Sequence, residues 1–225
     1  MLIAIEGADA VGKNEQSRRL TDALSATSQT CRMSFPRYDT TVGAAILRHL
    51  KEETQLVQII GGYDDREEHM IAAPSTDDPL MFQCMMLADK VHAAAGIRSM
   101  LAGGHVVLDR WWQSAYVYGS CDGLDETWLL QTHEFLPQAD LNILLILPVE
   151  ESQNRRPGLR DRYEKDVLKQ VKIREKYIEL WKQMIARSPK NDWVIVDSNK
   201  SRDEVFEQIM QRVRATAGRL KLDLA

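Results

Sequence analysis

The first twenty residues constrain this 225-residue chain more than any other stretch. The apolar run Leu2–Ile5 is typical of a buried strand. It leads into a loop bounded by Gly7 and Gly12, then into Lys13 and a polar stretch of helical character. Strand, glycine-bounded loop and helix, in that order, form the setting in which G-x-x-x-x-G-K cradles nucleotide phosphates. Backbone N–H groups point at phosphate oxygens there, and the helix N-terminus and the lysine add positive charge.

An ordinary turn between strand and helix, with a chance lysine, is the alternative interpretation of this loop. The two glycines, the lysine and their context together favour a phosphate site. The predicted nucleotide-phosphate site comprises Gly7, Ala8, Ala10, Val11, Gly12, Lys13, Asn14 and Glu15.

One position departs from the phosphate-loop pattern. Asn14 stands where the pattern has Ser or Thr, whose hydroxyl ligates Mg²⁺. An amide oxygen can also accept or ligate, directly or through water, so Asn14 is a candidate metal ligand. Glu15 would be unfavourable beside phosphates unless it points away or contributes to the metal site.

Composition limits the class of protein. The length suits one domain, or one domain with a lid. A net charge of −4 argues against non-specific binding of nucleic acid, which needs a basic surface. The widely spaced Cys31, Cys84 and Cys121 indicate reduced thiols and no zinc site. No run is apolar for long enough to span a membrane, and the chain starts on a core strand, so we expect a soluble, cytoplasmic protein without a membrane partner.

Five apolar segments alternate with helical patterns along the chain. This alternation predicts a parallel α/β sheet in three layers, within a single domain of residues 1–225. Strands are predicted at 2–5, 32–35, 105–109, 141–147 and 192–197. Helices are predicted from about 14 to 25–28 and at 41–51, 80–101 (interrupted near 96), 128–135, 167–186 and 202–220.

Two arginines follow predicted strands. Asp109 ends its strand, where nucleotide-binding folds hold the water shell of magnesium, and Arg110 comes next. Capping of the next helix is the alternative role for Asp109, but Asp-Arg followed by Trp111 and Trp112, downstream of a phosphate loop, favours a ligand site. Arg37, after the second strand, is interpreted either as a ligand contact or as a solvated loop residue.

Two irregular segments interrupt this pattern. Residues 55–79 are acidic and loop-like, and a solvated insertion is a safer interpretation than a flap over a site. Residues 152–165 carry an arginine run broken by Pro-Gly, which is interpreted as a basic lid rather than as a solvated face. Guanidinium groups brought in on closure would stabilise a transferring phosphoryl group. The arginines of this run are Arg155, Arg156, Arg160 and Arg162.

Over nearly its whole length the chain resembles thymidylate kinases, particularly the phage-type deoxynucleoside monophosphate kinases of the P-loop superfamily. The resemblance implies a P-loop kinase fold with a five-stranded parallel sheet of order 2-3-1-4-5, flanked by helices, and a short arginine-rich lid. The ordered motifs that carry it are Gly7–Lys13, Phe35–Tyr38, Asp109–Trp111 with Ser114 and Tyr118, and Asp161–Glu164.

The resemblance also implies roles for individual residues. Asp9 looks like the carboxylate that contacts the acceptor sugar, and Arg37 and Arg110 look like the arginines that hold the acceptor phosphate. Asp109, with Asn14, is similar to the site that organises Mg²⁺. The loop lacks an arginine between Asp9 and Gly12, a pattern that goes with catalytic arginines in the lid. The implied catalytic set is therefore Lys13, Asp9, Arg110, Arg155, Arg156, Arg160 and Arg162.

The acceptor base is assigned by the same resemblance. Ser114 and Tyr118 match positions that line its pocket, and Tyr163 matches a tyrosine on the lid. On the helix at 80–101, Lys90 takes roughly the place of the family's arginine, with Phe82 two turns before it.

The implied activity is the ATP-dependent phosphorylation of a deoxypyrimidine 5′-monophosphate, with dTMP first and dUMP or a modified dUMP next. The implied cofactor is Mg²⁺, the partners are ATP and the deoxynucleoside monophosphate, and the implied assembly is a homodimer. The location would be the host cytoplasm if a phage encodes the chain. A deoxynucleoside kinase and a nucleotide-binding protein that has lost turnover are the alternatives. The arginine count favours a monophosphate acceptor, whereas Asn14 and Glu15 favour the binding protein.

Overall fold

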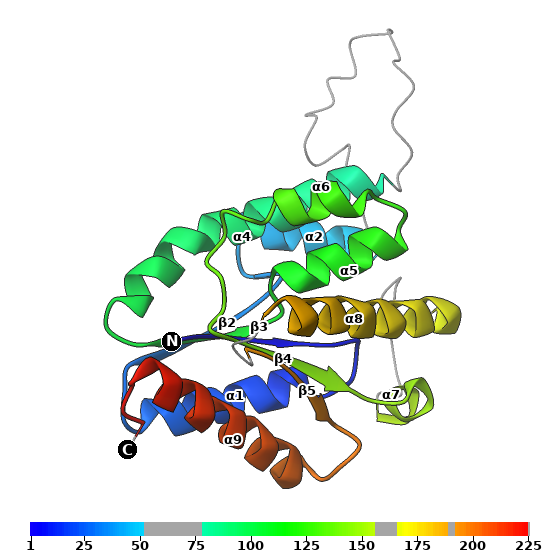
Figure 1. The fold of residues 1–225 in the computed structure, drawn as a ribbon. Helices are drawn as coiled ribbons and strands as arrows, with labels where there is room; N and C mark the ends of the chain where they lie inside the picture. The colour runs from blue at the N-terminus through cyan, green and yellow to red at the C-terminus, as the bar shows by residue number, and fades with distance from the viewer. Residues whose placement is uncertain (52–77, 156–165, 189–191, 225) are drawn as a thin grey trace, which may run out of the picture.

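The computed structural model describes residues 1–51, 78–155, 166–188 and 192–224 (Figure 1). Its centre is a parallel five-stranded sheet of order β2-β3-β1-β4-β5, which confirms the predicted architecture and strand order. β2 begins two residues before its predicted start. The strands are β1 (Leu2–Glu6), β2 (Thr30–Ser34), β3 (His105–Asp109), β4 (Leu141–Ile146) and β5 (Trp193–Asp197).

Helices cover both faces of the sheet. α1 and α9 lie on one face, and α2, α4, α5, α6 and α8 lie on the other (Figure 1). The helices are α1 (Lys13–Ser25), α2 (Thr41–Leu50), α4 (Pro79–Leu101), α5 (Trp112–Cys121), α6 (Glu126–Gln131), α7 (Val149–Arg155), α8 (Val167–Arg187) and α9 (Arg202–Leu220).

Four helices differ from the sequence prediction. α4 continues through Gly96 without interruption, and α6 begins and ends earlier than the predicted 128–135. α5 was not predicted, because most of its side chains are buried and it therefore lacks the polar face that marks an amphipathic helix. The first part of the predicted lid, residues 152–155, is the end of helix α7.

The central strand β1 is buried on both faces. Leu2 and Ala4 pack into the core beneath α4, α5 and α8, whereas Ile3 and Ile5 pack into the core beneath α1 and α9. Successive strand residues point to opposite faces, so a strand covered on both sides needs an unbroken apolar run. This explains why β1 reads as continuously apolar rather than as alternating.

The strand register brings the functional segments to one edge of the sheet. Ile5 of β1 and Ser34 of β2 both pair with Asp109 of β3. The residues that follow these three strands therefore emerge side by side at the carboxyl edge, where ligands bind in open α/β sheets. The phosphate loop, Arg37 and Arg110 all belong to these segments.

The three cysteines are free thiols, as predicted. Within the part of the chain that the structure describes, no helix combines the length and the apolarity needed to cross a bilayer.

Candidate functional site

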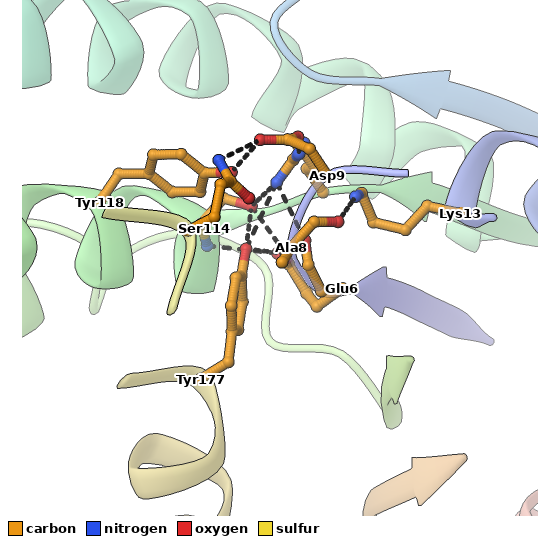
Figure 2. A network of polar contacts seen from close by, with 10 residues as sticks. Glu6, Ala8, Asp9, Lys13, Ser114, Tyr118 and Tyr177 are labelled. Carbon is orange, nitrogen blue, oxygen red and sulfur yellow. Dashed lines mark hydrogen bonds and ion pairs between the residues drawn. The ribbon is translucent and has the colours of Figure 1, made fainter. Parts of the chain in front are cut away.

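The phosphate loop has the backbone geometry that its glycines predict. Gly7 has φ 144°, and a Cβ there would lie 2.5 Å from the carbonyl oxygen of Leu145. Gly12 has φ 97° and precedes α1 without any side-chain cap, so the first N–H groups of the helix face the loop. The buried Lys13 turns back along the loop, and its Nζ donates to the Ala8 carbonyl at 2.5 Å (Figure 2). A cation and free N–H groups thus surround the loop, as phosphate binding requires.

Asp9, at the middle of the loop, forms an ion pair with Arg110 (Figure 2). Its Oδ2 accepts further hydrogen bonds from the Tyr118 hydroxyl at 3.0 Å and from Nε2 of Gln170 at 3.2 Å. Arg110 has a left-handed backbone, with φ 69°, a conformation that costs energy in residues other than glycine and clusters at functional sites. Three elements, the loop, α5 and α8, therefore fix one carboxylate and one guanidinium.

A second carboxylate, Glu6, lies beneath this pair and is fully buried. Its Oε1 accepts from the backbone N–H of Trp111 at 2.6 Å, and its Oε2 accepts from the hydroxyls of Ser114 at 2.6 Å and Tyr177 at 2.9 Å (Figure 2). Nη1 of Arg110 contacts both hydroxyl oxygens, at 3.2 Å and 3.4 Å. Glu6 therefore orients the residues on which the Arg110 side chain rests.

Burial and neighbouring charges shift the pKa values of Glu6, Asp9 and Lys13. Burial raises the pKa of Glu6, and hydrogen bonds from Ser114 and the charge of Arg110 only partly oppose it. Burial would also raise the pKa of Asp9, but Arg110 and Lys13 beside it hold that pKa below its usual value. Burial, with Arg110 nearby, lowers the pKa of Lys13 to about 8. Perturbed groups in one cluster are characteristic of functional sites.

The two predicted metal ligands face one common atom. Asn14 Oδ1 and Asp109 Oδ2 both accept hydrogen bonds from Nη2 of Arg32, at 3.0 Å and 3.1 Å. A carboxylate and an amide oxygen are donors that suit Mg²⁺, so the donor set fits the predicted ion, which would have to share this position with a guanidinium. The described residues contain no group of three or more His, Cys, Asp and Glu side chains placed to hold a metal.

The predicted acceptor residues on the α4 side contact partners of their own. Arg37 is fixed by Asp89, through Nε to Oδ1 at 2.9 Å, and by Nδ1 of His92 at 2.8 Å from its Nη2. Lys90 is buried, and its pKa is lowered to about 8 by that burial, with Asp89 opposing. Phe82 packs in the core, 5.0 Å from the ring of His49. The assignment of these side chains to the acceptor remains a prediction.

Several predicted residues lie elsewhere or outside the described part of the chain. Nη2 of Arg155 donates to the Ser198 carbonyl at 2.9 Å, at the end of β5. The predicted insertion lies outside the described residues except for 78 and 79, where α4 is capped and begins. Also outside them are Arg156, Arg160, Arg162 and Tyr163.

Four residues of the site were not predicted from the sequence. Glu6 directly follows one predicted strand and Arg32 begins another, and a charge at an apolar strand is the signal that would have identified them. Tyr177 was predicted only as an apolar contact of its helix, and no local pattern marks Gln170. Both reach the site because α8 packs against α5, on the same face of the sheet (Figure 1).

Comparison with known proteins points to a single family. The family model for thymidylate kinase matches residues 5–209. The chain is 25% identical over 215 residues to a probable thymidylate kinase of Saccharolobus solfataricus, covering 95% of this chain and 96% of the relative. It is 32% identical to a probable thymidylate kinase of Pyrococcus horikoshii, covering 79% and 81%. The solved thymidylate kinase of Candida albicans shares the fold, with a TM-score of 0.75, 24% identity and coverage of 95% and 91%. The chain belongs to the thymidylate kinase family.

Proposed function

We propose that this chain transfers the γ-phosphoryl group of ATP to the 5′-phosphate of dTMP, giving ADP and dTDP. Members of its family are nucleoside monophosphate kinases. The observation that carries the proposal is the convergence of two cations on the phosphate loop: Lys13 Nζ contacts the Ala8 carbonyl, and Arg110 Nη1 contacts the Gly7 carbonyl at 3.2 Å. Two phosphate-bearing substrates need cations on both sides of the transferring group.

The donor would bind along the loop. The N–H groups that follow Gly12 and the ammonium of Lys13 would hold the β- and γ-phosphates, and charge would be stabilised by groups that are already in place. Catalysis of this kind depends on positioning and electrostatics rather than on a covalent intermediate.

The acceptor would be held by Arg110. Asp9, Ser114 and Tyr177 fix its guanidinium, so one fork of donors is oriented before the substrate arrives. Arg37 would add a second contact from the other side of the acceptor phosphate. The low pKa of Asp9 keeps it ionised and makes it a poor base, which suits an acceptor that is already an anion.

Magnesium belongs to the same proposal as the companion of ATP, where it would neutralise the charge on the β- and γ-phosphates. Asn14 and Asp109 are the side chains that would share in holding it. The arginines Arg155, Arg156, Arg160 and Arg162 are proposed to reach the transferring group when the lid closes. Arg155 would then exchange its hydrogen bond with the Ser198 carbonyl for one with phosphate.

A coupled assay of ADP formation tests the proposal. Purified protein with ATP and Mg²⁺ is given dTMP, dUMP, dCMP, dGMP and thymidine in turn. We expect turnover with dTMP, its loss in Lys13→Met, and a fall of at least about a hundredfold in Arg110→Gln, because a fixed guanidinium stabilises developing charge. Arg98→Gln is the matched control, since Arg98 contacts only the Phe135 carbonyl among the described hydrogen bonds, at 2.7 Å.

Two other results of this assay would indicate a different function for the chain. Turnover with thymidine but not with dTMP would show a deoxynucleoside kinase. Binding of ATP without turnover of any acceptor would show a nucleotide-binding protein and would overturn the proposal.

A further inference from the structure

The Arg32 side chain bridges the two residues predicted to serve magnesium. Its Nη2 donates to both Asn14 Oδ1 and Asp109 Oδ2, and its Nε donates to the Ser17 hydroxyl at 2.7 Å. Arg32 thus ties β2 to the first turns of α1 and to the end of β3. It lies beside the phosphate loop, since Asn14 directly follows Lys13.

The ion pair between Arg32 and Asp109 is largely shielded from solvent, whereas Asn14 is exposed. The Arg32 side chain is 26% exposed and that of Asp109 only 7%, so their attraction is screened less than that of a surface pair. The bonds are charge-assisted and lie within the usual range of length, which holds the guanidinium in one place. A lone pair of each metal-ligand oxygen is therefore already directed at a cation.

We infer that Arg32 competes with Mg²⁺ for Asn14 and Asp109 and supplies a fixed positive charge there. A magnesium ion held by these oxygens would lie about 2.0–2.1 Å from each of them, within repulsive distance of the guanidinium. The metal must displace Arg32 or bind mainly through the phosphates of the nucleotide. The inference rests on the proposed ATP site and goes beyond it, because it assigns part of the metal's electrostatic role to an arginine.

The inference also explains why Asn14 stands where the phosphate-loop pattern has Ser or Thr. The hydroxyl that the phosphate-loop pattern places there is a donor as well as an acceptor, and it is shorter than the Asn side chain. The Asn14 amide presents a carbonyl oxygen far enough from the backbone to meet Arg32. Asn14 and Arg32 accordingly function as one unit, in which the Asn14 amide oxygen accepts the hydrogen bond that the Arg32 guanidinium donates.

A purely structural role is the alternative, in which Arg32 only ties β2 to α1 and β3 and the metal binds elsewhere. Both roles predict that replacing Arg32 lowers stability, because a buried carboxylate loses its partner. Only competition predicts that the replacement strengthens metal binding. The response to metal, rather than the melting temperature, therefore separates the two roles.

Binding of Mn²⁺ to the nucleotide-free protein, followed by the electron paramagnetic resonance of the free ion, tests the inference without any need for turnover. We expect Arg32→Met to bind Mn²⁺ about tenfold more tightly than the unaltered protein, because two oxygens lose a competing cation. Arg32→Lys keeps the charge and should bind Mn²⁺ as weakly as the unaltered protein. Arg98→Met, which removes a remote arginine, should change nothing.

Calorimetric titration with ADP, in Mg²⁺ and in EDTA, provides a second measurement. The dissociation constant for ADP in EDTA, divided by that in Mg²⁺, should be small in the unaltered protein. The same ratio should be about tenfold larger in Arg32→Met. Should Arg32→Met not fold, Arg32→Gln keeps an amide donor for Asp109 and carries the same test.

Equal Mn²⁺ affinity in the unaltered protein and Arg32→Met would overturn the inference, as would tighter Mn²⁺ binding by Arg32→Lys. A lower melting temperature with an unchanged metal response would show the structural role alone. These results are independent of the proposed kinase activity, which is judged by dTMP turnover.

Discussion

Glu6 and Asp9 are three positions apart, and their pKa values shift in opposite directions. Glu6 accepts hydrogen bonds from uncharged donors, the Trp111 N–H and two hydroxyls, and burial raises its pKa. Burial acts on Asp9 too, but Arg110 pairs with it directly and its pKa falls. Burial sets the cost of a charge, whereas the partner decides in which direction the pKa shifts. The loop therefore keeps one ionised carboxylate at the substrate side and one structural carboxylate below it.

The largest effect is expected from breaking the ion pair at the substrate side. Asp9→Ala leaves Arg110 without its carboxylate, and we expect the free energy of unfolding to fall by about 3 kcal/mol, as is typical for removing one partner of a buried pair. Urea unfolding measures this loss. Glu15→Ala, which removes an exposed pair with Arg18, should cost about 0.5 kcal/mol or less. Equal losses in the two variants would contradict the comparison.

Opposite pH dependences provide the next test. Because the pKa of Glu6 is raised, its contribution to stability is present below the ordinary value of 4.5 and is lost as the pH rises toward the raised pKa. Because the pKa of Asp9 is lowered, its contribution is present above 3.8 and is lost as the pH falls through the lowered pKa.

Glu6→Gln and Asp9→Asn should separate these two dependences. We expect Glu6→Gln to cost about 1 kcal/mol at pH 4, the net value of one hydrogen bond, and to cost less as the pH rises. Asp9→Asn should cost more as the pH rises from 3. Urea unfolding between pH 3 and 8 measures both, and parallel profiles would refute the assignment.

Lys13 is a cation beside Asp9, and it extends the comparison of the two carboxylates to a buried cation. Burial is the main cause that lowers the pKa of Lys13 to about 8, which is near the working pH. Phosphate favours the ammonium form, so ADP must bring about uptake of a proton once the free protein has lost it. Affinity for ADP should therefore fall about tenfold per pH unit above pH 8. Calorimetry at pH 7, 8 and 9 measures this fall. Lys13→Met should lose the dependence, and Lys90→Met, on the acceptor side, should keep it.

The smallest effects are expected from deleting single hydroxyls. Tyr118→Phe removes a donor to the ionised Asp9, and Tyr177→Phe removes a donor to Glu6. We expect Tyr118→Phe to lower kcat/KM for dTMP by about tenfold, since hydrogen bonds to charged groups contribute about 1.5 kcal/mol or more. Tyr177→Phe should chiefly lower the free energy of unfolding, by about 1 kcal/mol. A larger kinetic effect of Tyr177→Phe would reverse the roles assigned to the two carboxylates.

The phosphate loop was predictable because its chemistry is local. The glycines, Lys13 and the strand before them are adjacent in sequence, and the structure confirms the strand, the turn and the helix. The predicted Asp9, Arg110, Ser114 and Tyr118 also meet in one network. The predicted homodimer, the cytoplasmic location and the absence of a nucleic-acid partner remain predictions.

The contacts of Arg32, Gln170 and Tyr177 were not predictable, because their partners lie far away along the chain. Arg32 and Asp109 are 77 positions apart, and Gln170 and Asp9 are 161 apart. Pairings of this kind depend on strand order and on the way α8 crosses the sheet, which no local pattern records.

The sequence by itself determined the fold class, the phosphate loop and the family, since alternation of apolar strands with helices and short motifs are local properties. The tertiary structure alone decided in which direction the pKa of each carboxylate shifts and which cation stands between Asn14 and Asp109. Those outcomes depend on desolvation and on distances between side chains from β1, β2, β3, α5 and α8. Burial and proximity arise only when the chain is folded, and they control the electrostatics of the site.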